Sequence, residues 1–238
     1  MSGIDHARLG LALRVGVVPA LFALALIGPF LVWQFPGRPL AVLVEDSGAL
    51  PPGQGFYLFS KLAALYAIAL VALQIALALI RAAFPGKTVP PWSLPGHRLL
   101  GAFTVFAIIV HVAAFVAATS LRNEEFAWRL LLPVTGHGYY RTMVSVGAVA
   151  LWLSIAGVTV RALDRYRPGI RRLHPVLMLT VAALGIAHSY GIGSESNTTS
   201  VLILYAATLT VIVALWISRR SRRQRRGTNR AVRHGPLR

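Results

Sequence analysis

Residues 96–112 read GHRLLGAFTVFAIIVHV, with His97 before a long apolar run and His111 inside it. An ionisable side chain within such a run is costly in a membrane and usually serves a function. A later stretch, RRLHPVLMLTVAALGIAHSYGIG, repeats this pattern with His174 and His188. Both histidine pairs are fourteen residues apart. The two stretches therefore predict two related apolar helices that each carry two histidines.

The composition is typical of a protein with several membrane-spanning helices. Of the 238 residues, 56% are hydrophobic and 13% are charged. The chain has no cysteine, which excludes disulfides, zinc–thiolate sites, iron–sulfur clusters and haem attached through cysteine. The formal net charge is +17, and nine of the 24 basic residues lie in the last twenty positions. A basic tail after a membrane span is typical of an orientation signal or a contact with anionic lipids. We expect the lipid bilayer as a partner and no nucleic acid.

Six apolar stretches are long enough to cross a bilayer, which takes about 20 helical residues. They show no alternation of apolar and polar residues, so helices are expected rather than barrel strands. The sequence thus predicts an all-α membrane protein, a six-helix transmembrane bundle over residues 15–218, between an N-terminal segment 1–14 and a basic tail 219–238. The expected spans are Val15–Trp33, Leu58–Ile80, Leu99–Leu121, Thr142–Val160, Leu173–Ile192 and Val201–Ser218.

The first stretch also has features of a signal peptide, because Arg8 and Arg14 precede it. Its apolar run is longer than a typical signal core, so we expect a retained helix. With the N-terminus inside, nineteen of the 24 basic residues lie on the inner side and five on the outer side. The positive-inside rule then places both termini in the cytoplasm. We expect an integral protein of a bacterial cytoplasmic (inner) membrane.

The spacing of the histidines predicts how they meet. Fourteen helical residues turn through about 1400° and rise about 21 Å, so each pair shares one side of its helix at two depths. The two helices cross the membrane in the same direction. His97 is therefore expected to face His174 near the inner surface, and His111 to face His188 further out. Two histidines on opposite faces suit the iron of a haem, whereas zinc lacks further ligands. The pattern predicts two stacked b-type haems.

Other interpretations of the histidine pattern stay open. A single membrane histidine is often a hydrogen-bond partner between helices, and it is the repeated spacing that favours haem. One alternative class is a transporter whose histidines relay protons, and another is a structural subunit of a larger membrane complex. A single-haem protein is a milder variant.

Basic and aromatic residues near the histidines are further candidates. Arg98, Arg171 and Arg172 flank the inner pair and are candidates to bind haem propionates, or they simply follow the positive-inside rule. Arg122 and Arg141 are the corresponding candidates to bind haem propionates on the outer side, or they have no role in haem binding. Four aromatic residues are candidates to pack against a haem, or are plain packing residues: Phe103, Phe106, Phe115 and Tyr190.

The motifs GHRLLG…H and LHPVLML…AHSYG resemble the third and fifth helices of the ferric reductase-like transmembrane domain superfamily. This superfamily includes ferric-chelate reductases, NADPH oxidases and the haem-binding membrane subunit of the bacterial periplasmic methionine sulfoxide reductase system. The resemblance implies electron transfer from the cytoplasm outward. It also implies an inner b-type haem on His97 and His174 and an outer one on His111 and His188.

Many members of the superfamily carry a flavin- and nicotinamide-binding domain, and the sequence shows no G-x-G-x-x-G motif after a strand. We therefore expect a subunit that takes electrons from a separate cytoplasmic flavoprotein or quinol. Its acceptor is expected on the outer side, as a periplasmic enzyme, a metal chelate or oxygen. A noncovalent flavin or quinone at the cytoplasmic face is a further possibility.

Overall fold

The computed structural model describes residues 16, 18–34, 50–83, 93–134, 138–163, 166, 167 and 169–193, and four single positions between 206 and 217. Within these ranges the chain forms helices and short 3-10 turns, with no strand. The prediction of an all-helical protein is confirmed for this part of the chain. The elements are α2 (Val18–Gln34), α4 (Gln54–Ala83), α5 (Ser93–Asn123), η2 (Trp128–Leu131), α6 (Tyr139–Leu163), η3 (Ile170–Arg172) and α7 (Leu173–Ile192).

Four helices are long and apolar enough to cross a membrane: Gln54–Ala78, His97–Asn123, Tyr139–Leu163 and Leu173–Ile192. They confirm the second to fifth expected spans. The first expected span corresponds to α2, an apolar helix of 17 residues that is shorter than these four. The sixth expected span, 201–218, lies outside the described residues except for four single positions. The expected terminal segments 1–14 and 219–238 lie wholly outside them. Six spans and the cytoplasmic termini therefore stay predictions.

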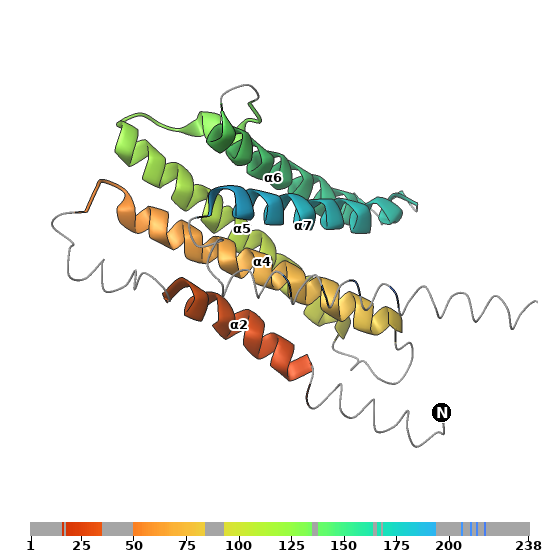
Figure 1. The fold of residues 1–238 in the computed structure, drawn as a ribbon. Helices are drawn as coiled ribbons and strands as arrows, with labels where there is room; N and C mark the ends of the chain where they lie inside the picture. Colours follow the sequence, from red (N-terminus) through yellow and green to blue (C-terminus); the bar gives the residue numbers. More distant parts are fainter. Residues whose placement is uncertain are drawn as a thin grey trace, which may run out of the picture.

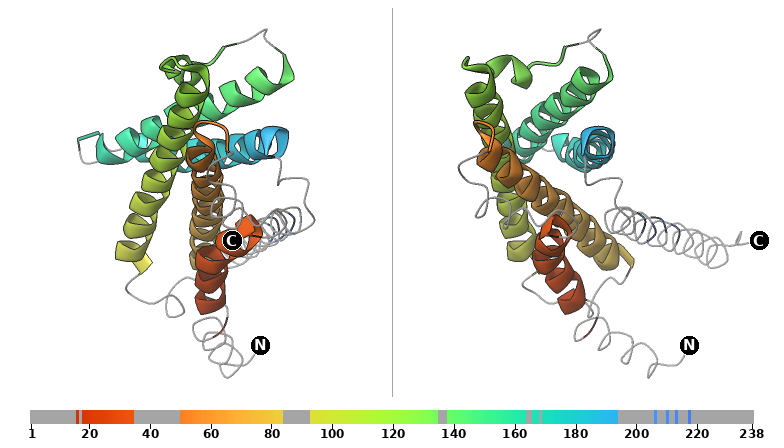
Figure 2. Two further views of the ribbon diagram at one scale, coloured as in Figure 1. Left: turned by 90° about the vertical axis from the view of Figure 1, so that its left-hand side faces the viewer. Right: turned by 60° about the vertical axis from the view of Figure 1, so that its left-hand side comes forward.

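The long helices form two antiparallel hairpins that cross. α4 packs along α5, and α6 packs along α7 (Figure 1). α2 lies against the side of α4. Figure 2 shows that the α6–α7 hairpin runs across the α4–α5 hairpin instead of alongside it. Contacts between the hairpins include those of α4 with α7.

Alanine and leucine side chains form a core shared by α2, α4 and α5, in which α4 packs against both other helices. Packing of this kind drives helix association where lipid is as apolar as the protein. Two hydrogen bonds also fasten α2 to α4, from Trp33 Nε1 to the Leu58 oxygen (3.1 Å) and from the Tyr66 hydroxyl to the Leu26 oxygen (3.0 Å). The buried core residues are Ala25, Ala69, Leu70, Leu73 and Leu100.

A polar contact joins α4 and α5 inside the apolar layer. Gln74 Nε2 donates to Thr104 Oγ1 (2.6 Å), and Thr104 Oγ1 donates to the Leu100 oxygen (2.7 Å). Thr104 is buried. Because no water reaches such groups in a bilayer, each polar side chain must find its partner within the protein. This contact therefore helps to fix the sliding register of α4 against α5.

The turn before α4 depends on Gly53. Its φ is 75°, and a Cβ atom there would lie 2.6 Å from the Ala118 oxygen on α5. Gly138, before α6, also has a positive φ of 86°, but a Cβ atom there would meet nothing within 4 Å. A side chain would strain the backbone at both glycines, but only at Gly53 would it also clash with another helix.

We expect Gly53→Ala to destabilise the protein more than Gly138→Ala. Both substitutions place alanine in the left-handed region, at a cost of about 1–2 kcal/mol. Only Gly53→Ala also pushes α4 away from α5. Thermal unfolding in detergent, followed by the loss of monodisperse protein, should give the lower midpoint for Gly53→Ala. Equal midpoints for the two variants would contradict the close approach of this turn to α5.

Candidate functional site

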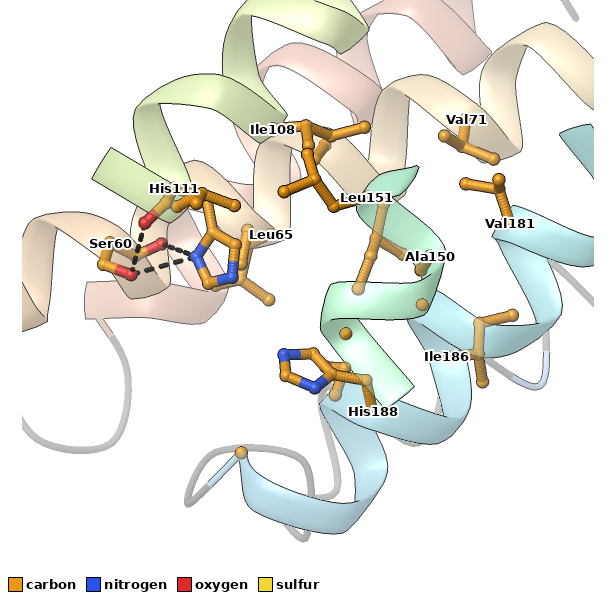
Figure 3. A pocket seen from close by; sticks show the side chains of 18 of the residues that line it. Ser60, Leu65, Val71, Ile108, His111, Ala150, Leu151, Val181, Ile186 and His188 are labelled. Carbon is orange, nitrogen blue, oxygen red and sulfur yellow. Dashed lines mark hydrogen bonds between the residues drawn. The ribbon is translucent and has the colours of Figure 1, made fainter. Parts of the chain in front are cut away.

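His111 of α5 and His188 of α7 meet in a cavity where the two hairpins cross. Their ring centres are 6.3 Å apart, and the ring planes make an angle of 71°. The two rings point toward each other from opposite walls (Figure 3). The cavity has a volume of about 200 Å³ and is lined by α4, α5, α6 and α7. Most of the lining is apolar, as with Leu65, Val71, Ile108, Leu151, Val181 and Ile186.

Each histidine is oriented by the other helix of its own hairpin. His111 Nδ1 lies 2.9 Å from the backbone oxygen of Ser60 on α4. His188 Nδ1 lies 2.6 Å from the backbone oxygen of Met143 on α6. A carbonyl oxygen can only accept, so this network assigns the proton of each neutral ring to Nδ1. The lone pair of each ring is then on Nε2, the nitrogen that can bind a metal.

The separation of the two rings suits two ligands of one metal. An imidazole nitrogen binds such a metal at about 2 Å, and the ring centre lies roughly 1.1 Å further away, so ligands on opposite sides have centres about 6.2 Å apart. The observed separation is 6.3 Å. The described residues contain no group of three or more metal-ligating side chains. A pair of this kind suits a planar cofactor that brings the remaining ligands of its own metal.

The surroundings of the two rings are closely packed on one side. A Cβ atom on Gly147 of α6 would lie 2.6 Å from both Cε1 and Nδ1 of His188, so only glycine fits beside that ring. Phe115 lies beside the His111 ring, with ring centres 6.4 Å apart and planes 21° apart. Phe115 also lines the cavity. The other aromatic candidates, Phe103, Phe106 and Tyr190, are exposed in the described structure.

Two basic side chains gather near the end of the cavity where α4 begins and α5 ends. Lys61 Nζ lies 4.6 Å from the ring centre of Tyr57, and Arg122 Cζ lies 4.8 Å from the same ring centre. Arg122 also donates a hydrogen bond to Gln54 Oε1. Lys61, Tyr57 and Tyr140 line the cavity. This end of the site therefore favours an anionic group. Arg122 and Arg141 are both exposed.

His174 repeats the hydrogen bond of His188 at a second depth. Its Nδ1 lies 3.0 Å from the backbone oxygen of Gly157 on α6. Gly157 follows Met143 by fourteen residues, and His174 precedes His188 by fourteen, so both bonds belong to one antiparallel register of α6 and α7. The spacing identified in the sequence is thus matched by equivalent partners on the neighbouring helix.

The first turns of α5 and α7, which hold His97 and His174, lie apart from each other in Figure 2. The reason is the crossing of the hairpins, which brings helices together at one depth and separates them at another. His97 is exposed, and His174 is half-buried. The structure therefore brings together the outer pair, and an inner pair of ligands stays a prediction.

The three arginines expected at the inner haem lie at these same helix starts. Arg98 follows His97 on α5 and is exposed. Arg172 is exposed and comes directly before α7. Arg171 belongs to η3, and its side chain lies outside the described part of the structure. Their roles as propionate ligands stay predictions.

Three residues of the site were not identified from the sequence, namely Ser60, Lys61 and Gly147. A serine followed by a lysine near the start of an otherwise apolar span is a weak signal for a site. Glycine is common in membrane helices and carries no signal of its own. Ser60 and Gly147 acquire their roles from the histidines opposite them on α5 and α7, and Lys61 acquires its role from its place beside Tyr57 in the cavity lining.

Comparisons of the chain with protein-family models, with curated proteins and with solved structures found no match. The resemblance to the ferric reductase-like superfamily therefore rests on the quoted motifs alone.

The pairing of α5 with α7 can be tested without any assumption about function. The chain has no cysteine, so the double variant His111→Cys, His188→Cys carries only the two introduced thiols. A short thiol reagent should crosslink them in membranes, because the two histidine rings face each other across the cavity. The matched variant His97→Cys, His174→Cys should crosslink poorly, because the starts of α5 and α7 lie apart. The readout is the mass of peptides that contain both helices. If only the His97→Cys, His174→Cys variant crosslinked efficiently, the result would contradict the crossing of the hairpins.

Proposed function

We propose that this chain is a membrane haem protein that relays electrons across the bilayer, and that His111 and His188 would hold a b-type haem. The observation that carries the proposal is the opposed pair of rings 6.3 Å apart, each with Nδ1 bonded to a backbone oxygen. A haem ligated by two histidines would supply one-electron transfer with no open position at the iron.

The residues around the pair have distinct tasks in this proposal. The carbonyl groups of Ser60 and Met143 hold both rings in the tautomer that would leave Nε2 free to bind the iron. The mostly apolar lining would suit the apolar faces of a porphyrin. Gly147 lets the His188 ring lie close against α6. Lys61 and Arg122, which both lie over the Tyr57 ring, would pair with the propionates at that end of the cavity.

A second haem at the inner side is part of the same proposal. The bond from His174 to Gly157 supports it, because that bond prepares His174 in the same way as His188. A second haem held by both His97 and His174 would need the starts of α5 and α7, which lie apart in this structure, to come together. Arg98, Arg171 and Arg172 are the candidates for its propionates. Electrons would come from a cytoplasmic flavoprotein or quinol, with or without a flavin or quinone bound at that face. They would leave to a periplasmic enzyme, a metal chelate or oxygen.

The composition of the cavity lining argues against a proton-coupled transporter. The described lining holds two histidines and one lysine and has no carboxylate. A proton relay in a membrane commonly uses carboxylates together with histidines. In addition, both histidines are bonded to backbone oxygens, which holds their rings in one orientation.

The first experiment is an absorbance spectrum of the purified protein, oxidised and then reduced, with a pyridine haemochrome assay to count haems. We expect His111→Ala and His188→Ala each to lose one haem per chain relative to the wild type. His6→Ala is the control, since His6 lies in the N-terminal segment 1–14, outside the expected spans. A colourless wild-type protein, produced with haem in excess, would overturn the proposal.

A second test uses the close fit of the His188 ring. Gly147→Ala adds a methyl group where Cε1 and Nδ1 of His188 would be only 2.6 Å away, so the ring must turn and lose its bond to Met143. We expect haem content to fall severalfold. Gly28→Ala on α2 is the matched control, because its added Cβ meets only Leu24 at 3.4 Å or more. Unchanged haem content in Gly147→Ala would contradict the assignment of His188 as a ligand.

A further inference from the structure

Ser60 of α4 contacts the His111 side chain through two different oxygen atoms. Both its hydroxyl Oγ and its backbone oxygen lie 2.9 Å from His111 Nδ1. The hydroxyl also donates to the backbone oxygen of His111 at 3.1 Å. With only 1% of its surface exposed, Ser60 is among the most buried side chains in the described structure. Figure 3 shows this double contact on the wall of the cavity opposite His188.

The directions of these bonds follow from the donors available. The single hydroxyl proton of Ser60 is used by the His111 backbone oxygen, so the lone pairs of Oγ remain to accept. The Nδ1–H of His111 is then shared between two acceptors of one residue. His188 differs, because its Nδ1–H donates to the carbonyl of Met143. The two rings of the pair are therefore held by unequal sets of acceptors.

We propose that Ser60 is a positioning residue that lowers the reduction potential of the haem between His111 and His188; this rests on the function proposed above. Acceptors on Nδ1–H give the imidazole more anionic character and make it a stronger donor to the iron. A stronger donor stabilises the ferric state, which lowers the potential. Burial strengthens the effect, because no water competes for the Nδ1 proton.

The double contact has a second consequence for the ring itself. Oγ and the backbone oxygen of Ser60 hold Nδ1 from two directions, so the His111 ring has little freedom to turn about χ2. Removing the hydroxyl leaves the backbone oxygen of residue 60 in place. Ser60→Ala therefore leaves His111 with a carbonyl acceptor of the kind that His188 has, and ligation is expected to survive.

The test is a redox titration of the haem-loaded, full-length protein and of three variants. The relevant haem is the one that is lost in His111→Ala. Ser60→Ala should raise the midpoint potential of that haem. We expect a threefold to tenfold shift in the equilibrium constant for reduction, up to about 59 mV for one electron. Ser60→Thr, which keeps a hydroxyl, should return the potential toward the wild-type value. Ser154→Ala is the matched control, since buried Ser154 lines the same cavity but donates to Ala150 of its own helix.

Each outcome separates the inference from the function on which it rests. An unchanged potential in haem-loaded Ser60→Ala would overturn the inference and leave the haem site intact. An equal shift in Ser154→Ala would also overturn it, because the effect would then come from the cavity as a whole. Should Ser60→Ala fail to fold, Ser60→Cys, with its weaker acceptor, must raise the potential above the wild-type value, and an unchanged potential in Ser60→Cys would overturn the inference. A wild-type protein without haem would overturn the proposed function itself.

Discussion

The hydrogen bond from a histidine ring to a carbonyl of the adjacent helix is the interaction on which the site depends. In the apolar interior of a bilayer protein no water is available to replace it. His111 uses the carbonyl of Ser60, and His188 uses that of Met143. Because a carbonyl only accepts, each bond sets the tautomer of its ring and directs the free lone pair into the cavity. The same bonds tie α5 to α4 and α7 to α6.

The crossing of the hairpins explains why there is a cavity at this depth. Each hairpin is packed closely along its own length, as the Gln74–Thr104 contact and the tight fit of Gly147 to His188 illustrate. Where the two hairpins cross, their side chains cannot interdigitate over a long stretch. Space is therefore left between α4, α5, α6 and α7. A cofactor held from both hairpins would fill that space and join the two halves of the protein.

Much of the fold was predictable from apolar run lengths. The expected span Leu173–Ile192 has the same bounds as α7, and the spans begun at Leu58, Leu99 and Thr142 lie within α4, α5 and α6. These helices extend beyond the predicted bounds, because polar residues at their ends continue the helix outside the apolar region. The short turn η2 within the loop after α5 was not anticipated. Its pattern is too short to show periodicity.

The candidate site was predictable only in part. The fourteen-residue spacing indicated that His111 lies on the same side of its helix as His97, and His188 on the same side as His174. It therefore predicted a pair His97–His174 as strongly as the pair His111–His188. Ser60 and Gly147 could not be identified, since their roles depend on which residue of another helix lies opposite, and Lys61 could not be identified because its role depends on where the cavity lies. That register follows from many small packing contacts rather than from any local pattern.

The sequence by itself determined that the chain forms long apolar helices and that each of two helices carries two histidines on one side. The length of an apolar run and the 3.6-residue period are local properties, so they can be read along one chain. Only the tertiary structure decided that His111 meets His188, that Ser60 holds one ring, and that the starts of α5 and α7 diverge. The physical reason is that the crossing of two helix hairpins is set by packing between residues far apart in the sequence.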